Sequence, residues 1–283
     1  QKQIAENLGI SRSTVIRMLE EARRRAEVQI WINGTPDDCT ELALALEEAF
    51  SLDEAVVVPG RGSAQETAND VGSALGRFLS EVIQDDMAVG VGWGRTLNAS
   101  LQTFRPPPRT NTRIVSLLGG ILEARWINPI DYSWQVASRL QAECMLFLAP
   151  LLVDSAATKR RLIERCGLDR LFDQAAKLDL VVISCGDLAT REGSIGLGIL
   201  DAEVRDAILK AGAVCDVCCN FLDTKGNTVK HGFADRLMNT DIDAIAGAGH
   251  VVLASGGAER AKAIRAAILR TGCDTLITDE AAA

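Results

Sequence analysis

Histidine is scarce in this 283-residue sequence, which has only His231 and His250, and no run of about 20 uncharged apolar residues occurs in it. With two histidines, a second pair of ligands for a zinc site is hard to find, and acid–base catalysis has few copies of its commonest side chain. The missing apolar run excludes a membrane-spanning helix, and the first residues do not show the basic and then apolar pattern of a signal peptide. We therefore expect a cytoplasmic protein that is not an enzyme and holds no metal or other cofactor.

Eight cysteines are present, but their spread over the chain is not that of a disulfide framework, and we expect reduced thiols. The densest cluster, CDVCC at 215–219, admits two interpretations. Its cysteines are zinc-type ligands, yet it lies within AVCDVCCNFL, an apolar run that is typical of a buried strand. The apolar surroundings favour a structural role in the core over a metal site.

Charge is distributed unevenly along the chain, whose formal net charge is −8. Residues 1–27 contain six basic and four acidic side chains, a local net charge of +2, whereas the remainder has a net charge of −10. Only the front of the chain is therefore electrostatically suited to the phosphates of DNA. The hydrophobic content of 47% is enough to fill a sizeable core.

The front of the chain predicts two short helices joined by a turn. In QKQIAENLG, apolar residues recur at helical spacing and Gly9 is placed as a C-terminal stop. Ser11 is a natural N-cap for a second helix, whose apolar stripe consists of Val15, Leu19, Ala22 and Ala26. This arrangement is typical of a helix-turn-helix, in which the start of the second helix enters the major groove. The residues placed to contact DNA are Ser11, Arg12, Ser13, Thr14 and Arg17.

An ordinary solvent-facing helical hairpin is the alternative, because any amphipathic pair of helices has a charged side. The helix that usually precedes this motif is not found, so we expect the helix-turn-helix region, 1–33, to be incomplete at its N-terminus. A short β segment after ARRRAEVQIWIN would form a wing. Residues 34–51 are expected to form a linker and the first helix of a second domain, 52–283, which binds an effector and mediates oligomerisation.

From about residue 52 short apolar runs alternate with helical patterns, which predicts βαβ units and a mostly parallel, Rossmann-like sheet. Four runs end at glycine: MAVGVGWG at Gly94, RIVSLLGG at Gly119 and Gly120, LVVISCG at Gly186, and HVVLASGG at Gly256 and Gly257. Each glycine alone suits a tight turn. Because ligands of open α/β sheets bind beyond the carboxyl ends of the strands, the four together favour one shared pocket.

Polar residues beside these glycines suit a sugar or an anion. Arg95 and Thr96 begin a predicted helix and offer a guanidinium and a hydroxyl, and Arg260 is expected in the first turn of another. Asp216 lies in an apolar strand, where an unpaired acid is costly. It either accepts hydrogen bonds from sugar hydroxyls or pairs with an arginine of the protein, and the sequence leaves both open.

Two further patterns concern structure. The tryptophans at 93, 126 and 134 are expected in the core or in a pocket wall. The segment FLDTKGNT at 221–228 has the turn residues of a hairpin.

Several motifs together resemble the SorC family of sugar-responsive transcriptional regulators, and their order covers nearly the whole chain. They are IAENLGISRSTVIRMLEEAR, VGVGWGRTL, SLLGG, LAPLLVDS, GAVCDVCCNFLDTKGN, VVLASGGAERAKAIRAAI and LITDEAAA. The resemblance implies a winged helix-turn-helix joined to a domain related to glucosamine-6-phosphate deaminase and ribose-5-phosphate isomerase. It also implies a tetramer that binds an operator.

Carried over by motif, Gly94, Arg95 and Thr96 match the family's phosphate-contacting loop, and Asp216 matches an acidic position near the sugar. Arg260 stands where many members have lysine. Both arginines depart from the commonest phosphate-binding patterns, so a sugar, a polyol and a sugar phosphate all remain candidate effectors.

The leading hypothesis is therefore a transcriptional regulator whose operator binding is controlled by such an effector. One alternative is a sugar-phosphate isomerase or deaminase-like enzyme on the same fold. Another is a sugar-binding or oligomerisation protein that does not bind DNA through its front helices.

Overall fold

The computed structural model describes residues 5, 9–24, 37–60, 62–121, 128–189 and 202–283. The chain divides into two compact units, Gln1–Gly34 and Thr35–Ala283. The predicted wing falls outside the described residues, as does most of the helix expected in QKQIAENLG. None of the helices in the described part combines the length and the apolar character needed to cross a membrane.

The first unit contains helix α2 (Arg12–Arg24), which begins where the sequence predicts. The Ser11 hydroxyl accepts a hydrogen bond from the Thr14 N–H over 3.1 Å and so caps the helix. Before it, Gly9 has a φ of +65° and the Ile10 N–H donates to the Ala5 carbonyl over 3.0 Å. Such a bond beside a left-handed glycine is typical of a helix C-terminus.

The second unit is built on a sheet of seven parallel strands in the order β1-β10-β9-β5-β2-β3-β4. They are β1 (Glu54–Val58), β2 (Ala88–Val91), β3 (Arg113–Ser116), β4 (Glu143–Met145), β5 (Leu180–Ile183), β9 (Val251–Ala254) and β10 (Thr275–Asp279). The four runs predicted to end at glycine are β9, β5, β2 and β3. They are consecutive in the sheet, which confirms the predicted α/β fold with a parallel sheet.

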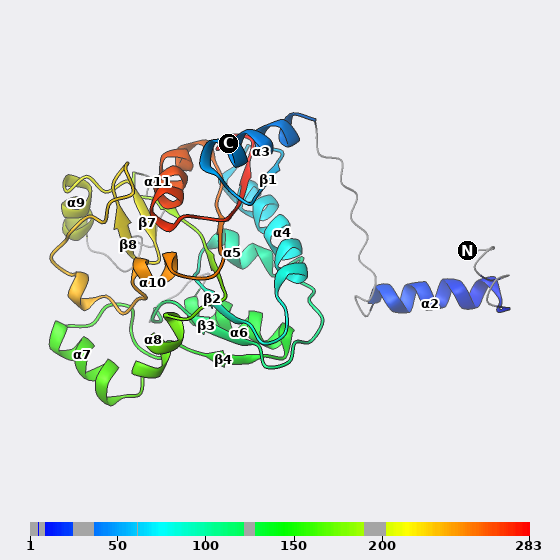
Figure 1. Ribbon diagram of the computed structural model, residues 1–283, viewed down its shortest axis with the longest axis horizontal. Helices are drawn as coiled ribbons and strands as arrows, with labels where there is room; N and C mark the ends of the chain where they lie inside the picture. Colours follow the sequence, from blue (N-terminus) through cyan, green and yellow to red (C-terminus); the bar gives the residue numbers. More distant parts are fainter. Residues whose placement is uncertain (1–4, 6–8, 25–36, 61, 122–127, 190–201) are drawn as a thin grey trace. The chain divides into compact units, whose positions relative to one another are not determined.

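Helices cover both faces of this sheet, which explains why its strands are almost continuously apolar (Figure 1). Along β5, Leu180 and Val182 belong to one core cluster, and Val181 and Ile183 belong to the other. The described helices of the second unit are α3 (Asp37–Phe50), α4 (Ala64–Val82), α5 (Arg95–Ser100), α6 (Pro129–Leu140), α7 (Ala156–Arg165), α8 (Asp169–Ala175), α9 (Ala202–Lys210), α10 (Ile242–Ala246) and α11 (Ala261–Thr271), with 3₁₀ turns η2 (Ala234–Arg236) and η3 (Ala258–Arg260).

A second, antiparallel sheet consists of β6 (Gly186–Asp187), β7 (Cys215–Val217) and β8 (Asn220–Leu222). The prediction of one buried strand across AVCDVCCNFL is therefore wrong, because the chain reverses at Cys218 and Cys219. Both cysteines have left-handed backbones, with φ of +49° and +61°. The Asp216 carboxylate accepts the Cys219 N–H over 2.8 Å, which stabilises the unusual turn.

The predicted hairpin at 221–228 is confirmed, since Leu222 bridges Thr228 in antiparallel fashion. The Asp223 carboxylate accepts the N–H groups of Lys225 and Asn227 over 2.8 and 2.9 Å. Gly226 has a φ of +81°, a conformation that glycine adopts easily.

The core alternative for the tryptophans is wrong at one position. Trp134 lies on α6 with 57% of its surface exposed, so it does not belong to the core. Trp93 is half-buried after β2, and Trp126 lies outside the described residues.

Candidate ligand-binding site at the carboxyl ends of the strands

The carboxyl ends of β9, β5, β2 and β3 lie side by side in the parallel sheet. The end of the sheet at which its strands terminate is here called the carboxyl edge, and the opposite end, at which they begin, is called the amino edge. Neither term refers to the outer strands. Gly94 follows β2 with a φ of +140° and precedes α5. A Cβ added to Gly94 would lie 3.7 Å from the Ser184 Cβ, just after β5. The loop after β2 therefore runs beside the end of β5.

The start of α5 is held in place by close packing against α4. A Cβ at Gly72 would lie 2.5 Å from the Thr96 carbonyl oxygen, and one at Gly76 would lie 2.2 Å from the Ser100 carbonyl oxygen. Only glycine permits such a close approach of the two helices. Thr96 is 3% exposed and Arg95 is half-buried, so both predicted site residues lie in a fixed turn at the carboxyl edge.

Gly119 and Gly120 follow β3, and their amide groups are already used within the protein. The Gly119 N–H donates to the Met238 carbonyl and the Gly120 N–H to the Ala149 carbonyl, both over 2.8 Å. A Cβ at Gly119 would lie 2.7 Å from the Ala149 carbonyl oxygen. These two glycines thus join neighbouring loops to the end of β3, and their N–H groups are not open to an anion.

The ends of β9 and β10 are joined through Asp279, a residue that sequence reasoning missed. Its carboxylate accepts the Gly257 N–H over 2.8 Å and would contact a Cβ at Gly256 at 2.9 Å. Asp279 is 1% exposed. The available signal was an acid at the end of the apolar run TLIT, since a charge is buried at a strand end only where it has partners.

Arg260 brings a buried cation to the same edge. It lies in η3, just before α11 and not in the first turn of α11, and it is 6% exposed. Its Nη1 donates to the Gly256 carbonyl over 2.9 Å, while its buried Nε has no hydrogen-bond partner among the described residues. A buried donor without a partner is costly, which favours a ligand atom as its acceptor.

The charges of Asp216 and Arg260 both act on the thiol of Cys185, which lies two residues beyond the end of β5 at Ile183. The hydrogen bond from Cys215, together with Ser255 and the charge of Arg260, lowers the pKa of Cys185, against burial and the charge of Asp216. Burial raises the pKa of Cys215. Asp216 is 3% exposed and is paired across the hairpin sheet with Gly186, which continues from β5. The acid and the cation therefore both lie near Cys185 at the carboxyl edge.

The hairpin turn is also attached to the strand ends. A Cβ at Gly92, after β2, would lie 3.0 Å from the Cys218 Sγ. The Asn239 side chain donates to the Cys218 carbonyl over 2.9 Å, next to the Met238 that binds Gly119. The predicted residues of all four strand ends and Asp216 thus belong to one connected set of loops.

The residues predicted to contact DNA gather at the start of α2. Ser11, Arg12, Ser13 and Arg17 are exposed and Thr14 is half-buried, whereas Val15 on the other side is 3% exposed. The Ser11 hydroxyl lies 2.7 Å from that of Ser13 and 2.9 Å from that of Thr14. At the start of the helix, polar residues are therefore exposed on one side while Val15 is buried on the other.

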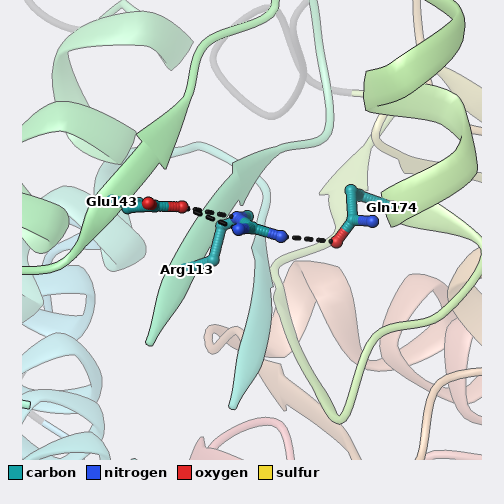
Figure 2. A network of polar contacts seen from close by, with 3 residues as sticks. All are labelled: Arg113, Glu143 and Gln174. Atoms are coloured by element: carbon teal, nitrogen blue, oxygen red, sulfur yellow. Dashed lines mark hydrogen bonds and ion pairs between the residues drawn. The ribbon is translucent and has the colours of Figure 1, made fainter. Parts of the chain in front are cut away.

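A separate open cavity of about 380 Å³ lies at the amino edge, lined by Arg113, Glu143, Met145, Arg170, Asp173 and Gln174. Figure 2 shows its polar network. Arg113 donates to the Glu143 carboxylate from Nε and Nη2, over 2.9 and 2.7 Å, and to the Gln174 amide oxygen from Nη1 over 3.0 Å. Because these groups satisfy one another and are partly exposed, the cavity is a weaker candidate for a ligand than the carboxyl edge.

Comparison with known proteins assigns the second unit to a family. Residues 35–283 match the family model Sugar-bind, described as "Putative sugar-binding domain". The chain is 29% identical over 286 residues to the deoxyribonucleoside regulator of Bacillus subtilis (strain 168), covering 99% of this chain and 90% of that protein. It is 24% identical over 282 residues to the erythritol catabolism regulatory protein EryD of Brucella abortus (strain 2308), covering 99% and 89%.

Among solved structures, the full-length sorbitol operon regulator SorC of Klebsiella pneumoniae matches with a TM-score of 0.80 and 25% identity, over 99% of this chain and 91% of that one. The likeness extends through both units and confirms the resemblance seen in the sequence motifs. The chain therefore belongs to the sugar-binding-domain family, among the SorC-type transcriptional regulators.

Proposed function

We propose that this regulator binds a sugar, a polyol or a sugar phosphate at the carboxyl edge and that this effector controls its binding to operator DNA. The single observation that carries the proposal is the burial of three charged side chains at this edge: Asp216, Arg260 and Asp279 are 3%, 6% and 1% exposed. Two of the relatives named above are a deoxyribonucleoside regulator and an erythritol catabolism regulatory protein, which supports a polyhydroxy effector.

The chemistry of the edge suits such a ligand. Carboxylates accept hydrogen bonds from hydroxyl groups, and a guanidinium donates to hydroxyl or phosphate oxygens. The proposed effector contacts come from Gly94, Arg95, Thr96, Asp216, Gly256, Gly257, Arg260 and Asp279, with Gly119 and Gly120 shaping the loop after β3. The unpartnered Nε of Arg260 is the donor that gains most from a ligand oxygen.

DNA contact is proposed for the helix-turn-helix region, 1–33, and effector binding and oligomerisation for 52–283. A homotetramer in the cytoplasm would offer paired recognition helices to operator half-sites about 34 Å apart. Effector binding would change how the subunits pack and so alter the distance between the two recognition helices. A small change in that distance would prevent both helices from binding their half-sites at once. By linkage, operator DNA would then alter the affinity for the effector as well.

A thermal-shift screen tests the effector site directly. The intact chain is heated with erythritol, sorbitol, ribose, deoxyribose and their phosphates, each as a separate sample. A ligand at 100 times its dissociation constant adds about 2.7 kcal/mol to the free energy of unfolding and raises the melting temperature. A tenfold loss of affinity lowers this stabilisation to about 1.4 kcal/mol, so a clearly smaller shift in Arg260→Met and Asp216→Asn supports the site. An equal shift in both variants would place the ligand elsewhere.

Operator binding is tested with Arg12→Ala and Arg17→Ala. Both side chains are exposed on α2, so their loss should weaken DNA binding without lowering the melting temperature. Each lost phosphate contact should also flatten the slope of log affinity against log salt by about 0.9. Arg160→Ala, at an exposed arginine of α7, is the matched control and should bind DNA like the unmodified chain. Normal binding by both α2 variants would contradict the assignment of the recognition helix.

The enzyme alternative has a direct test of its own. Incubation of the intact chain with the same sugar phosphates should give no isomerised or deaminated product. Turnover that is lost in Asp216→Asn would replace the regulator-only proposal with a catalytic one.

A further inference from the structure

Three metal-ligating side chains from distant parts of the sequence meet at the amino edge, away from the proposed effector site. Asp53 precedes β1, His250 precedes β9 and Asp274 precedes β10. Because β1, β10 and β9 are neighbours in the parallel sheet, their starting points lie side by side. One potential ligand atom from each residue lies within 4.8 Å of the other two.

The backbone around this cluster is fixed by hydrogen bonds. The Asp53 N–H donates to the Asp274 carbonyl over 2.8 Å, and the Asp274 N–H donates to the Val251 carbonyl over 3.0 Å. In return, the Val251 N–H donates to Asp274 Oδ2 over 2.6 Å. This bond orients the Asp274 carboxylate, whose oxygens offer further lone pairs to another partner.

The imidazole of His250 is also oriented. Its Nε2 lies 2.8 Å from the hydroxyl oxygen of Thr275, which is 1% exposed. Metal-binding histidines usually hold one ring nitrogen in such a bond, which fixes the ring while the other nitrogen binds the ion. His250 and Asp274 are half-buried and Asp53 is exposed, so an ion can reach the cluster from solvent.

We propose that Asp53, His250 and Asp274 bind a first-row divalent metal ion of the zinc class. One imidazole and two carboxylates suit zinc and its neighbours, whereas magnesium and calcium prefer oxygen ligands alone. Two adjacent carboxylates repel each other, and a divalent cation removes that repulsion. The ion would join the connection between α3 and β1 to the starts of β9 and β10, and the remaining coordination position would hold water.

The test uses the full chain, treated with a chelator and then titrated with zinc near neutral pH in a calorimeter. Cys166→Ser serves as the background, because Cys166 is an exposed thiol that competes for zinc. We expect one equivalent to bind. Loss of an outer partner of a metal ligand costs about 10-fold to 100-fold in affinity, so Asp53→Asn and His250→Asn should each weaken binding at least as much. His231→Gln, at the other histidine, should leave the affinity unchanged.

Cobalt(II) in place of zinc identifies the donor atoms, because thiolate ligands give a strong near-ultraviolet charge-transfer band that nitrogen and oxygen ligands do not. We expect no such band. Absence of stoichiometric binding, undiminished affinity in Asp53→Asn and His250→Asn, or a thiolate band would each overturn the proposal. If His250→Asn does not fold, two other variants decide. Asp53→Asn changes an exposed side chain. Thr275→Val removes the partner of the imidazole and should lower the zinc affinity about tenfold.

Discussion

The two edges of the parallel sheet differ in how deeply their charged side chains are buried. At the carboxyl edge Asp216, Arg260 and Asp279 are almost fully buried. At the amino edge the side chains of Arg113 and Glu143 are 38% and 71% exposed and bind each other. Burial of a charge is costly unless it has partners, whereas exposed pairs contribute little to stability. The difference explains why we place the effector at the carboxyl edge, where a ligand can complete the hydrogen bonding.

The largest effect is expected from the helix packing that holds α5 at the carboxyl edge. Gly76→Ala places a Cβ 2.2 Å from the Ser100 carbonyl oxygen and 2.9 Å from the Phe104 nitrogen. Because both are backbone atoms, the helices must separate, at a cost of about 3 kcal/mol in the free energy of unfolding. Urea denaturation measures it. The matched control is Gly232→Ala, because a Cβ added there meets nothing within 4 Å. Gly167→Ala is unsuitable as a control, because the left-handed backbone of Gly167 would itself be strained by a side chain. Equal stability of Gly76→Ala and the unmodified chain would show that the close packing is not needed.

Next in size is the hairpin that carries the buried acid. Asp216→Ala removes the acceptor of the Cys219 N–H and should cost about 1–3 kcal/mol. Asp216→Asn retains an oxygen acceptor and should cost less. Denaturation of the two variants side by side separates the hydrogen bond from the charge. If both were equally unstable, the carboxylate charge and not this bond would hold the turn of two left-handed cysteines.

A smaller effect is expected for effector affinity at the same edge. Arg260→Met keeps the length of the buried side chain but removes its donors, so the affinity for the best ligand of the screen should fall about tenfold, or about 1.4 kcal/mol. Lys262→Met, at an exposed residue of α11, should bind the ligand normally. Calorimetry on both variants measures the difference, and equal affinities would remove Arg260 from the site.

The smallest effect is expected at the amino edge. Glu143→Gln breaks the ion pair with Arg113, whose partly exposed side chains limit its contribution to less than about 1 kcal/mol. Effector affinity should be unchanged, because the strand starts lie at the far end from the proposed site. A loss of affinity comparable to that of Arg260→Met would abolish the contrast between the two edges.

The sequence predicts correctly which strand ends lie together at the carboxyl edge, because a parallel sheet places the carboxyl ends of its strands on the same side. Four apolar runs that end at glycine must bring those glycines to the same side of a parallel sheet, and their adjacency is confirmed. Family likeness and the N-cap of α2 at Ser11 are also predicted correctly.

Other features depend on contacts that no local pattern reveals. Cysteine is not a typical turn residue, and the reversal at Cys218 and Cys219 depends in part on contacts of Cys218 with Gly92 and Asn239, which are distant in the sequence. Asp279 gains its role from Gly257, which lies three residues beyond the neighbouring strand β9. Asp53 and His250 are brought together only by the order β1-β10-β9.

The most direct test of the account is the affinity of the intact chain for its operator, measured by fluorescence anisotropy at fixed salt with and without the best ligand from the thermal-shift screen. Coupling between two sites is typically worth about 5-fold to 150-fold in affinity. We predict a change in this range, which in Arg260→Met should require about tenfold more ligand. Equal operator affinity with and without a saturating ligand would contradict the central claim that the carboxyl edge controls DNA binding.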